Sequence, residues 1–73
     1  MQTFIKTLTI GGRPLVLRFE MKDRNHFFVT CLNDKTVEPI ELRKEENWTI
    51  TGGGAEEIRK NEKKLIAVLE ENC

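Results

Sequence analysis

The stretch at residues 55–71 constrains the fold most, because it is amphipathic and needs a surface to pack against. Mostly apolar residues recur in it at helical spacing and form one stripe along the predicted helix, whereas lysine, arginine and glutamate occupy the opposite side. The residues before it form short alternating runs separated by turn signals, which is typical of β-strands. The sequence therefore predicts one helix packed on an antiparallel sheet. The stripe comprises Ala55, Ile58, Glu62, Leu65, Ile66 and Leu69.

A hairpin is predicted at the start of the chain, because Gly11-Gly12 separates two alternating runs at residues 3–10 and 14–22. Both central residues of a type I′ turn need positive φ, which glycine adopts at little cost. One register gathers the large apolar side chains on a single face, and a slip of one residue would scatter them. The predicted pairs are Phe4 with Phe19, Lys6 with Leu17, Leu8 with Leu15 and Ile10 with Arg13.

Three more strands are predicted at residues 26–32, 36–44 and 47–51, followed by a helix at 55–71. Pro39 lacks an amide donor and indicates a bulge or an edge position. The triple glycine at 52–54 reads as a flexible linker, with Gly54 as a modest helix N-cap. We therefore expect an α+β fold in a single domain, 1–73: an antiparallel β-meander of four to five strands with one C-terminal α-helix packed on one face.

Composition argues against a resident metal or organic cofactor, and we expect none. The chain has 73 residues, one histidine and two cysteines, Cys31 and Cys73, without a CxxC pair. This pattern favours a reducing, cytoplasmic location. No apolar run approaches the roughly 20 residues of a membrane span, and the first residues lack the features of a signal peptide. A single core of this size supplies only about 3 to 5 kcal/mol, so self-association is a natural source of further stability.

The sequence does not favour an enzyme. It contains no serine and no tyrosine, so Cys31 and His26 are the candidates for nucleophile and base. They lie five positions apart on one predicted strand, which sends their side chains to opposite faces of the sheet. The glycine-rich segment lacks the lysine and hydroxyl residue of a phosphate-binding loop. Trp48 is expected to pack in the core or at its rim.

The third predicted strand is apolar on both faces, although one helix can cover only one of them. Phe27, Val29 and Cys31 point to one side, whereas Phe28 and Leu32 point to the other. The leading hypothesis is therefore a non-enzymatic protein-interaction module that forms a homodimer, with a further protein partner open. The predicted dimer interface is Ile5, Val16, Phe28 and Leu32.

An alternative use of the same face is binding of single-stranded nucleic acid. Residues 1–35 carry a net charge of +3 and residues 36–73 a net charge of −3, although the whole chain is neutral. Basic side chains beside an exposed aromatic ring could contact the phosphate backbone and stack on a base. The order of strands followed by one helix resembles that of some single-stranded-DNA-binding domains, in topology only. The candidate residues are Arg18, Lys22, Arg24 and Phe28.

Overall fold

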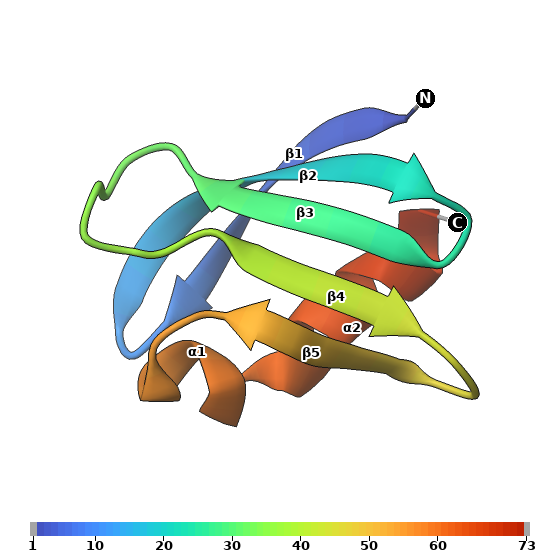
Figure 1. The fold of residues 1–73 in the computed structure, drawn as a ribbon. Helices are drawn as coiled ribbons and strands as arrows, with labels where there is room; N and C mark the ends of the chain where they lie inside the picture. Colours follow the sequence, from blue (N-terminus) through green and yellow to red (C-terminus); the bar gives the residue numbers. More distant parts are fainter. Residues whose placement is uncertain (1, 73) are drawn as a thin grey trace.

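The computed structural model describes residues 2–72. Five antiparallel strands in the order β1-β2-β3-β4-β5 precede two short helices (Figure 1). This architecture confirms the predicted α+β meander with a C-terminal helical segment. The elements are β1 (Thr3–Ile10), β2 (Arg13–Asp23), β3 (His26–Cys31), β4 (Ile40–Lys44), β5 (Trp48–Gly53), α1 (Glu56–Lys60) and α2 (Glu62–Asn72).

The β1–β2 hairpin has the predicted register. Phe4 lies opposite Phe19, and Ile10 lies opposite Arg13. Gly11 and Gly12 have φ angles of 61° and 77°, as the turn between these strands requires. Because β1 has no bulge, the alternating face that the sequence predicts is kept along the whole strand.

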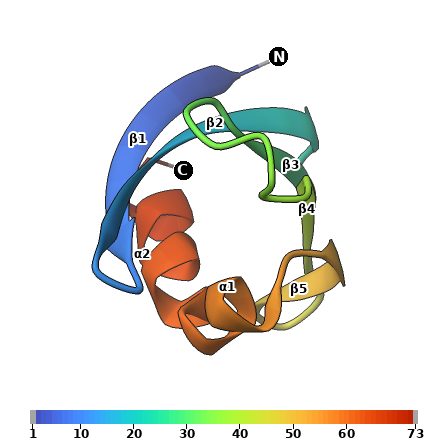
Figure 2. The same ribbon diagram turned by 90° about the vertical axis from the view of Figure 1, so that its left-hand side faces the viewer.

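The sheet is strongly curved, and the helices lie inside the curve (Figure 2). In this view β1 and β5 are the two ends of the sheet, and the helical segment lies between them. The core fills the space between the sheet and the helices. Its buried side chains are Ile10, Leu15, Leu17, Phe19, Phe27, Val29, Ile40, Leu42, Trp48, Ile58, Leu65, Val68 and Leu69.

Aromatic rings link the two halves of the sheet within this core. Phe4 stacks on Phe19 with ring centroids 5.0 Å apart, and its edge approaches Phe27 at 6.2 Å. Phe27 in turn meets Trp48 of β5 edge to face at 5.5 Å. Such pairs contribute about 0.5 to 1.5 kcal/mol beyond the area they bury. The prediction that Trp48 packs in the core is confirmed, since its exposed fraction is 6%.

The fourth strand is shorter than predicted. It begins at Ile40, and residues 36–39 form the end of a turn and a loop. Asp34 organises that turn: its Oδ1 accepts bonds from the amide and the hydroxyl of Thr36, at 2.9 and 2.6 Å. The irregularity in pairing occurs between β4 and β5 beside Thr51, not at Pro39. Side-chain bonds within 34–36 therefore take the place of the first part of the strand predicted at residues 36–44.

The triple glycine is not a flexible linker. Gly52 and Gly53 belong to β5, and Gly53 and Gly54 have φ angles of 69° and 77°. A Cβ atom on Gly53 would collide with the carbonyl oxygen of Pro39. These glycines therefore permit a left-handed turn and a close backbone approach. The helix N-cap is Ala55 rather than Gly54, and it has no side-chain capping bond.

The predicted single helix is interrupted at Asn61, whose φ and ψ are −106° and 22°. The Asn61 side-chain amide donates to the carbonyl oxygen of Glu57 at 2.8 Å. An asparagine side chain can compete with helical backbone bonds in this way, which ends α1 after Lys60. The apolar spacing continues across the break, so Ile58 and Leu65 both face the core.

Candidate interaction surface

The side of the sheet away from the helices is called the outer face below. Strand pairing places Glu20 of β2, Phe28 of β3 and Glu41 of β4 in one row across it. His26 lies opposite Arg43 in a neighbouring row. Because odd and even positions of a strand point to opposite sides, Phe27 and Val29 face the core instead.

Glu41 is the centre of one polar cluster on the outer face. Its Oε2 lies 3.0 Å from His26 Nε2, and its Oε1 lies 3.3 Å from Arg43 Nε. The hydroxyl of Thr51 donates to Oε1 at 3.1 Å. The bond from His26, followed by those from Thr51 and Arg43, holds the pKa of the Glu41 carboxyl below its usual value, although desolvation opposes the shift. The carboxylate is therefore satisfied by protein groups.

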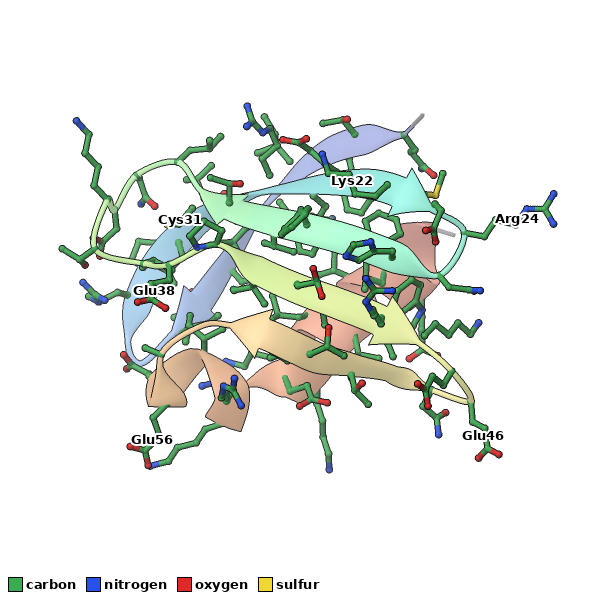
Figure 3. The ribbon with its side chains drawn as sticks, viewed as in Figure 1. Lys22, Arg24, Cys31, Glu38, Glu46 and Glu56 are labelled. Carbon is green, nitrogen blue, oxygen red and sulfur yellow. The ribbon has the colours of Figure 1, made fainter. Side chains whose placement is uncertain are left out.

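Glu20 is the centre of a second polar cluster. Its carboxylate lies 2.9 Å from Arg18 Nε and 3.4 Å from Lys22 Nζ. The Lys22 ammonium also lies 5.4 Å from the centroid of the Phe28 ring, a distance suited to a cation–π contact. Lys22 and Arg24 are labelled in Figure 3, where Arg24 extends from the turn between β2 and β3.

These contacts bear on the predicted nucleic-acid site. Arg18, Lys22 and Phe28 lie together on the outer face, as predicted, whereas Arg24 lies in the turn after β2. Arg18 and Lys22 are both paired with Glu20, and the ring of His26 lies 5.4 Å from the Phe28 ring. Sequence reasoning did not foresee that Glu20 and Glu41 flank Phe28 on both sides. The function itself stays a prediction.

An apolar patch lies on a different part of the outer face, over β1, β2 and the end of β3. Ile5 and Leu32 are the exposed large hydrophobic residues among those the structure describes, at 58% and 46%. Leu32 donates its amide to the carbonyl of half-buried Val16 at 2.8 Å, and Val16 lies diagonally from Ile5 across the β1–β2 pair. Ile5, Val16 and Leu32 are called the apolar patch.

Phe28 is separated from the apolar patch. It lies four residues from Leu32, a distance of roughly 13 Å along an extended strand. It is also half-buried, with Lys22 and His26 beside its ring. The structure thus brings together three members of the predicted dimer interface and places the fourth in a polar environment.

Asn33 organises the backbone beneath the patch, a role that sequence reasoning missed. Its Oδ1 accepts from the Val16 amide at 3.0 Å and from the Cys31 thiol at 3.2 Å. Its Nδ2 donates to the carbonyl of Pro14 at 2.9 Å. Through these bonds the Asn33 side chain extends the hydrogen bonding between β2 and β3 by one residue beyond Leu32. The Asn33-Asp34 pair after an apolar strand is the available signal, but it predicts a turn without indicating these particular bonds.

The structure also bears on the other candidate chemistries. Cys31 packs against the core while His26 lies on the outer face, so the two do not meet. Across residues 2–72, no group of three histidine, cysteine, aspartate or glutamate side chains is placed to hold a metal ion. Neither α1 nor α2 is long and apolar enough to span a membrane.

A shallow hollow lies between α2 and the turn that joins β4 to β5. Its lining is mixed in charge and polarity, and buried Trp48 forms part of its wall. Lys44, Glu46 and Glu70 contribute its charged groups. The lining residues are Lys44, Glu46, Asn47, Trp48, Ile66 and Glu70.

Comparison with known proteins gives no relative: no family model, curated protein or solved structure significantly matches this chain.

Proposed function

We propose that this chain is a small, non-enzymatic, cytoplasmic protein-interaction module that self-associates as a homodimer through its apolar patch. The observation that carries the proposal is the placement of Ile5 and Leu32. Both are large, exposed and on the same side of the sheet; the strand register places half-buried Val16 next to Leu32 and diagonally from Ile5, with Arg18 directly opposite Ile5. Exposed apolar side chains that gather in this way are typical of interaction sites.

The energetic argument follows from the size of the chain. Burying one large aliphatic side chain contributes about 1.5 to 3 kcal/mol, and a two-fold interface would bury each patch residue twice. A domain of this size has only a few kcal/mol of stability from its own core. Covering even one patch side chain, such as Ile5, in both copies would therefore add a substantial share of the total stability.

The proposal of a non-enzymatic role is supported by the contacts that the carboxylates of the outer face already make with neighbouring side chains. The Glu41 carboxylate lies within 3.3 Å of His26, Arg43 and Thr51, and Glu20 is shared by two cations. General acid–base or nucleophilic catalysis needs a reactive group held toward a substrate position by a base or an orienting partner. The separation of Cys31 from His26 leaves that arrangement unformed.

Sedimentation equilibrium over a range of protein concentrations tests the proposal. We expect a dimer that dissociates on dilution, and Ile5→Glu should shift the protein to monomer while its circular dichroism spectrum is retained. Ala67→Glu is the matched control, because Ala67 is an exposed position on α2 away from the patch. A wild-type chain that stays monomeric at millimolar concentration would refute the proposed self-association.

A further inference from the structure

The edge of the sheet at β1 presents unpaired backbone groups. The Gln2 carbonyl accepts a hydrogen bond from the Met21 amide at 2.9 Å, so the backbone carbonyl of Gln2 points toward β2. Backbone groups alternate in direction along a strand, and therefore those of Thr3, Ile5, Thr7 and Thr9 point away from β2, toward the open edge. The bond from Lys64 Nζ to the Thr9 carbonyl, at 2.7 Å, confirms this direction independently.

The opposite edge of the sheet is less open. β5 has six residues, its register shifts beside Thr51, and its Gly53 carbonyl accepts from Arg59 at 3.3 Å. Bulges and covering side chains are the usual means by which a sheet edge is closed to another strand. β1, by contrast, has eight residues in unbroken register, with Lys64 covering one end. Each chain thus offers one edge suited to strand pairing.

A strand edge of this kind can pair with a second copy of itself around a two-fold axis. Because Lys64 occupies the Thr9 carbonyl, the usable outward residues are Thr3, Ile5 and Thr7. Centring the axis on Ile5 uses all three, since Thr3 of each copy then lies opposite Thr7 of the other. Centring it on Lys6 would place two ammonium groups opposite each other, which is unfavourable.

We propose that two copies join edge to edge through β1, antiparallel and centred on Ile5, and form one continuous sheet across the dimer. This inference rests on the proposed self-association and places its contact at the β1 edge, with Ile5 as the patch residue on the axis; Leu32, on the far side of β2 from that edge, stays exposed in this dimer. The pairing satisfies the outward amides and carbonyls of Thr3, Ile5 and Thr7 in both chains. It also places Ile5 of one copy against Ile5 of the other, which makes the two apolar patches continuous. A closed dimer results, because the edge at β5 does not take part.

Amide hydrogen exchange of the wild-type chain tests the pairing directly. In a single chain the amides of Thr3, Ile5 and Thr7 face solvent and exchange quickly. At concentrations where sedimentation shows a dimer, we expect them to exchange at least tenfold more slowly, as the amides of Phe4 and Lys6 do in both states. A dimer in which the Ile5 and Thr7 amides still exchange quickly would overturn edge pairing and leave self-association intact.

A pair of variants at Thr7 gives a second test. Thr7→Pro removes an amide that has no partner within β1 and β2, so the isolated fold keeps its bonds. Thr7→Val keeps that amide and has a similar shape. We expect Thr7→Pro to raise the dimer dissociation constant at least tenfold and Thr7→Val to leave it within about threefold. Equal effects of the two variants would contradict the proposed hydrogen bonds.

Charge exchange at Ile5 tests the position of the axis without proline. Ile5→Lys and Ile5→Glu should each be monomeric, because like charges would meet across the axis. An equimolar mixture of the two should recover a heterodimer by sedimentation. If wild type is a dimer but the mixture stays monomeric, Ile5 is not on the axis. If wild type itself is a monomer, the proposed function fails together with this inference.

Discussion

Lys64 Nζ donates a 2.7 Å hydrogen bond to the carbonyl oxygen of Thr9, and this contact ties α2 to the outward edge of β1. It joins residues 55 positions apart, between elements that the sequence places at opposite ends of the chain. We expect Lys64→Met to lower the free energy of unfolding by about 0.5 to 1.5 kcal/mol, measured by urea denaturation. Lys63→Met, at an exposed neighbouring position, should change it less. Equal effects would indicate that only helix surface charge matters.

Gly53 and Gly52 are adjacent, but they should respond differently to alanine. Gly53 has a φ of 69°, and a Cβ atom there would meet the Pro39 carbonyl oxygen. Gly53→Ala should therefore destabilise the fold by at least about 1 to 2 kcal/mol, the cost of a left-handed conformation alone. At Gly52 a Cβ atom would meet only the Cβ of Glu41, at 3.7 Å. Thermal melts in which both variants fall by the same amount would contradict this difference.

Much of the sheet could be predicted from the sequence, because its signals are local. The alternation of residues 3–22 around Gly11-Gly12 determines the register, and that register is the observed one. The start of β4 and the helix break could not be predicted in the same way. Both depend on side chains that bond to the backbone, namely Asp34 to the Thr36 amide and Asn61 to the Glu57 carbonyl. Asparagine and aspartate have several such options, and tertiary geometry selects among them.

The sequence predicts which residues lie on the outer face but not which of their side chains contact one another. The sequence places Phe28 and Leu32 on one side of the sheet, and the structure agrees. Alternation cannot show which charged side chain leans over which ring, because β3 and β4 are joined by a loop of unpredictable shape. The contact between Glu41 and His26 therefore has no local signal in the sequence.

The pH dependence of folding should reflect Glu41 and Asp34. The bond from the Thr36 hydroxyl, then that from its amide, lowers the pKa of Asp34; the Glu41 pKa is lowered chiefly by His26. A folded pKa below the unfolded value means that the stabilisation is fully present above about pH 5 and is lost as pH falls through the lower folded values. Urea midpoints at pH 7, 4, 3 and 2 measure the loss.

Asp34→Asn and Glu41→Gln are the variants that identify the source of this acid sensitivity. Neither replacement titrates, so each variant should lose less stability than wild type between pH 5 and pH 2. Glu46→Gln is the matched control, because Glu46 is an exposed residue of the β4–β5 turn. An acid-induced loss in Glu41→Gln as steep as in wild type would show that its contacts do not persist in solution.

Binding of single-stranded nucleic acid makes an opposing prediction for the outer face. Arg18 and Lys22 are paired with Glu20, so contact with phosphate would have to displace an existing partner. We expect no rise in anisotropy with labelled oligonucleotides at micromolar protein and low salt. Binding that weakens steeply with salt, and that Arg18→Glu weakens for every oligonucleotide sequence tested, would favour the nucleic-acid function instead.

Phe28→Glu tests the row formed by Glu20, Phe28 and Glu41 separately from the apolar patch. Phe28 lies between Glu20 and Glu41 in the strand register, so the variant would place three carboxylates side by side. Adjacent like charges destabilise a sheet, and the contact with Lys22 would be altered, so the melting temperature should fall. Phe28→Gln is the uncharged control and should fall less.

The mass of the same variant in solution locates the dimer interface. If the contact is formed by Ile5, Val16 and Leu32, Phe28→Glu should still sediment as a dimer at concentrations where its fold is retained. Ile5→Glu should instead be monomeric with a melting temperature lowered only by the loss of association, because Ile5 is exposed within the single chain. A monomeric Phe28→Glu with an intact fold would extend the interface across the outer face to include Phe28. It would also exclude a contact confined to the apolar patch.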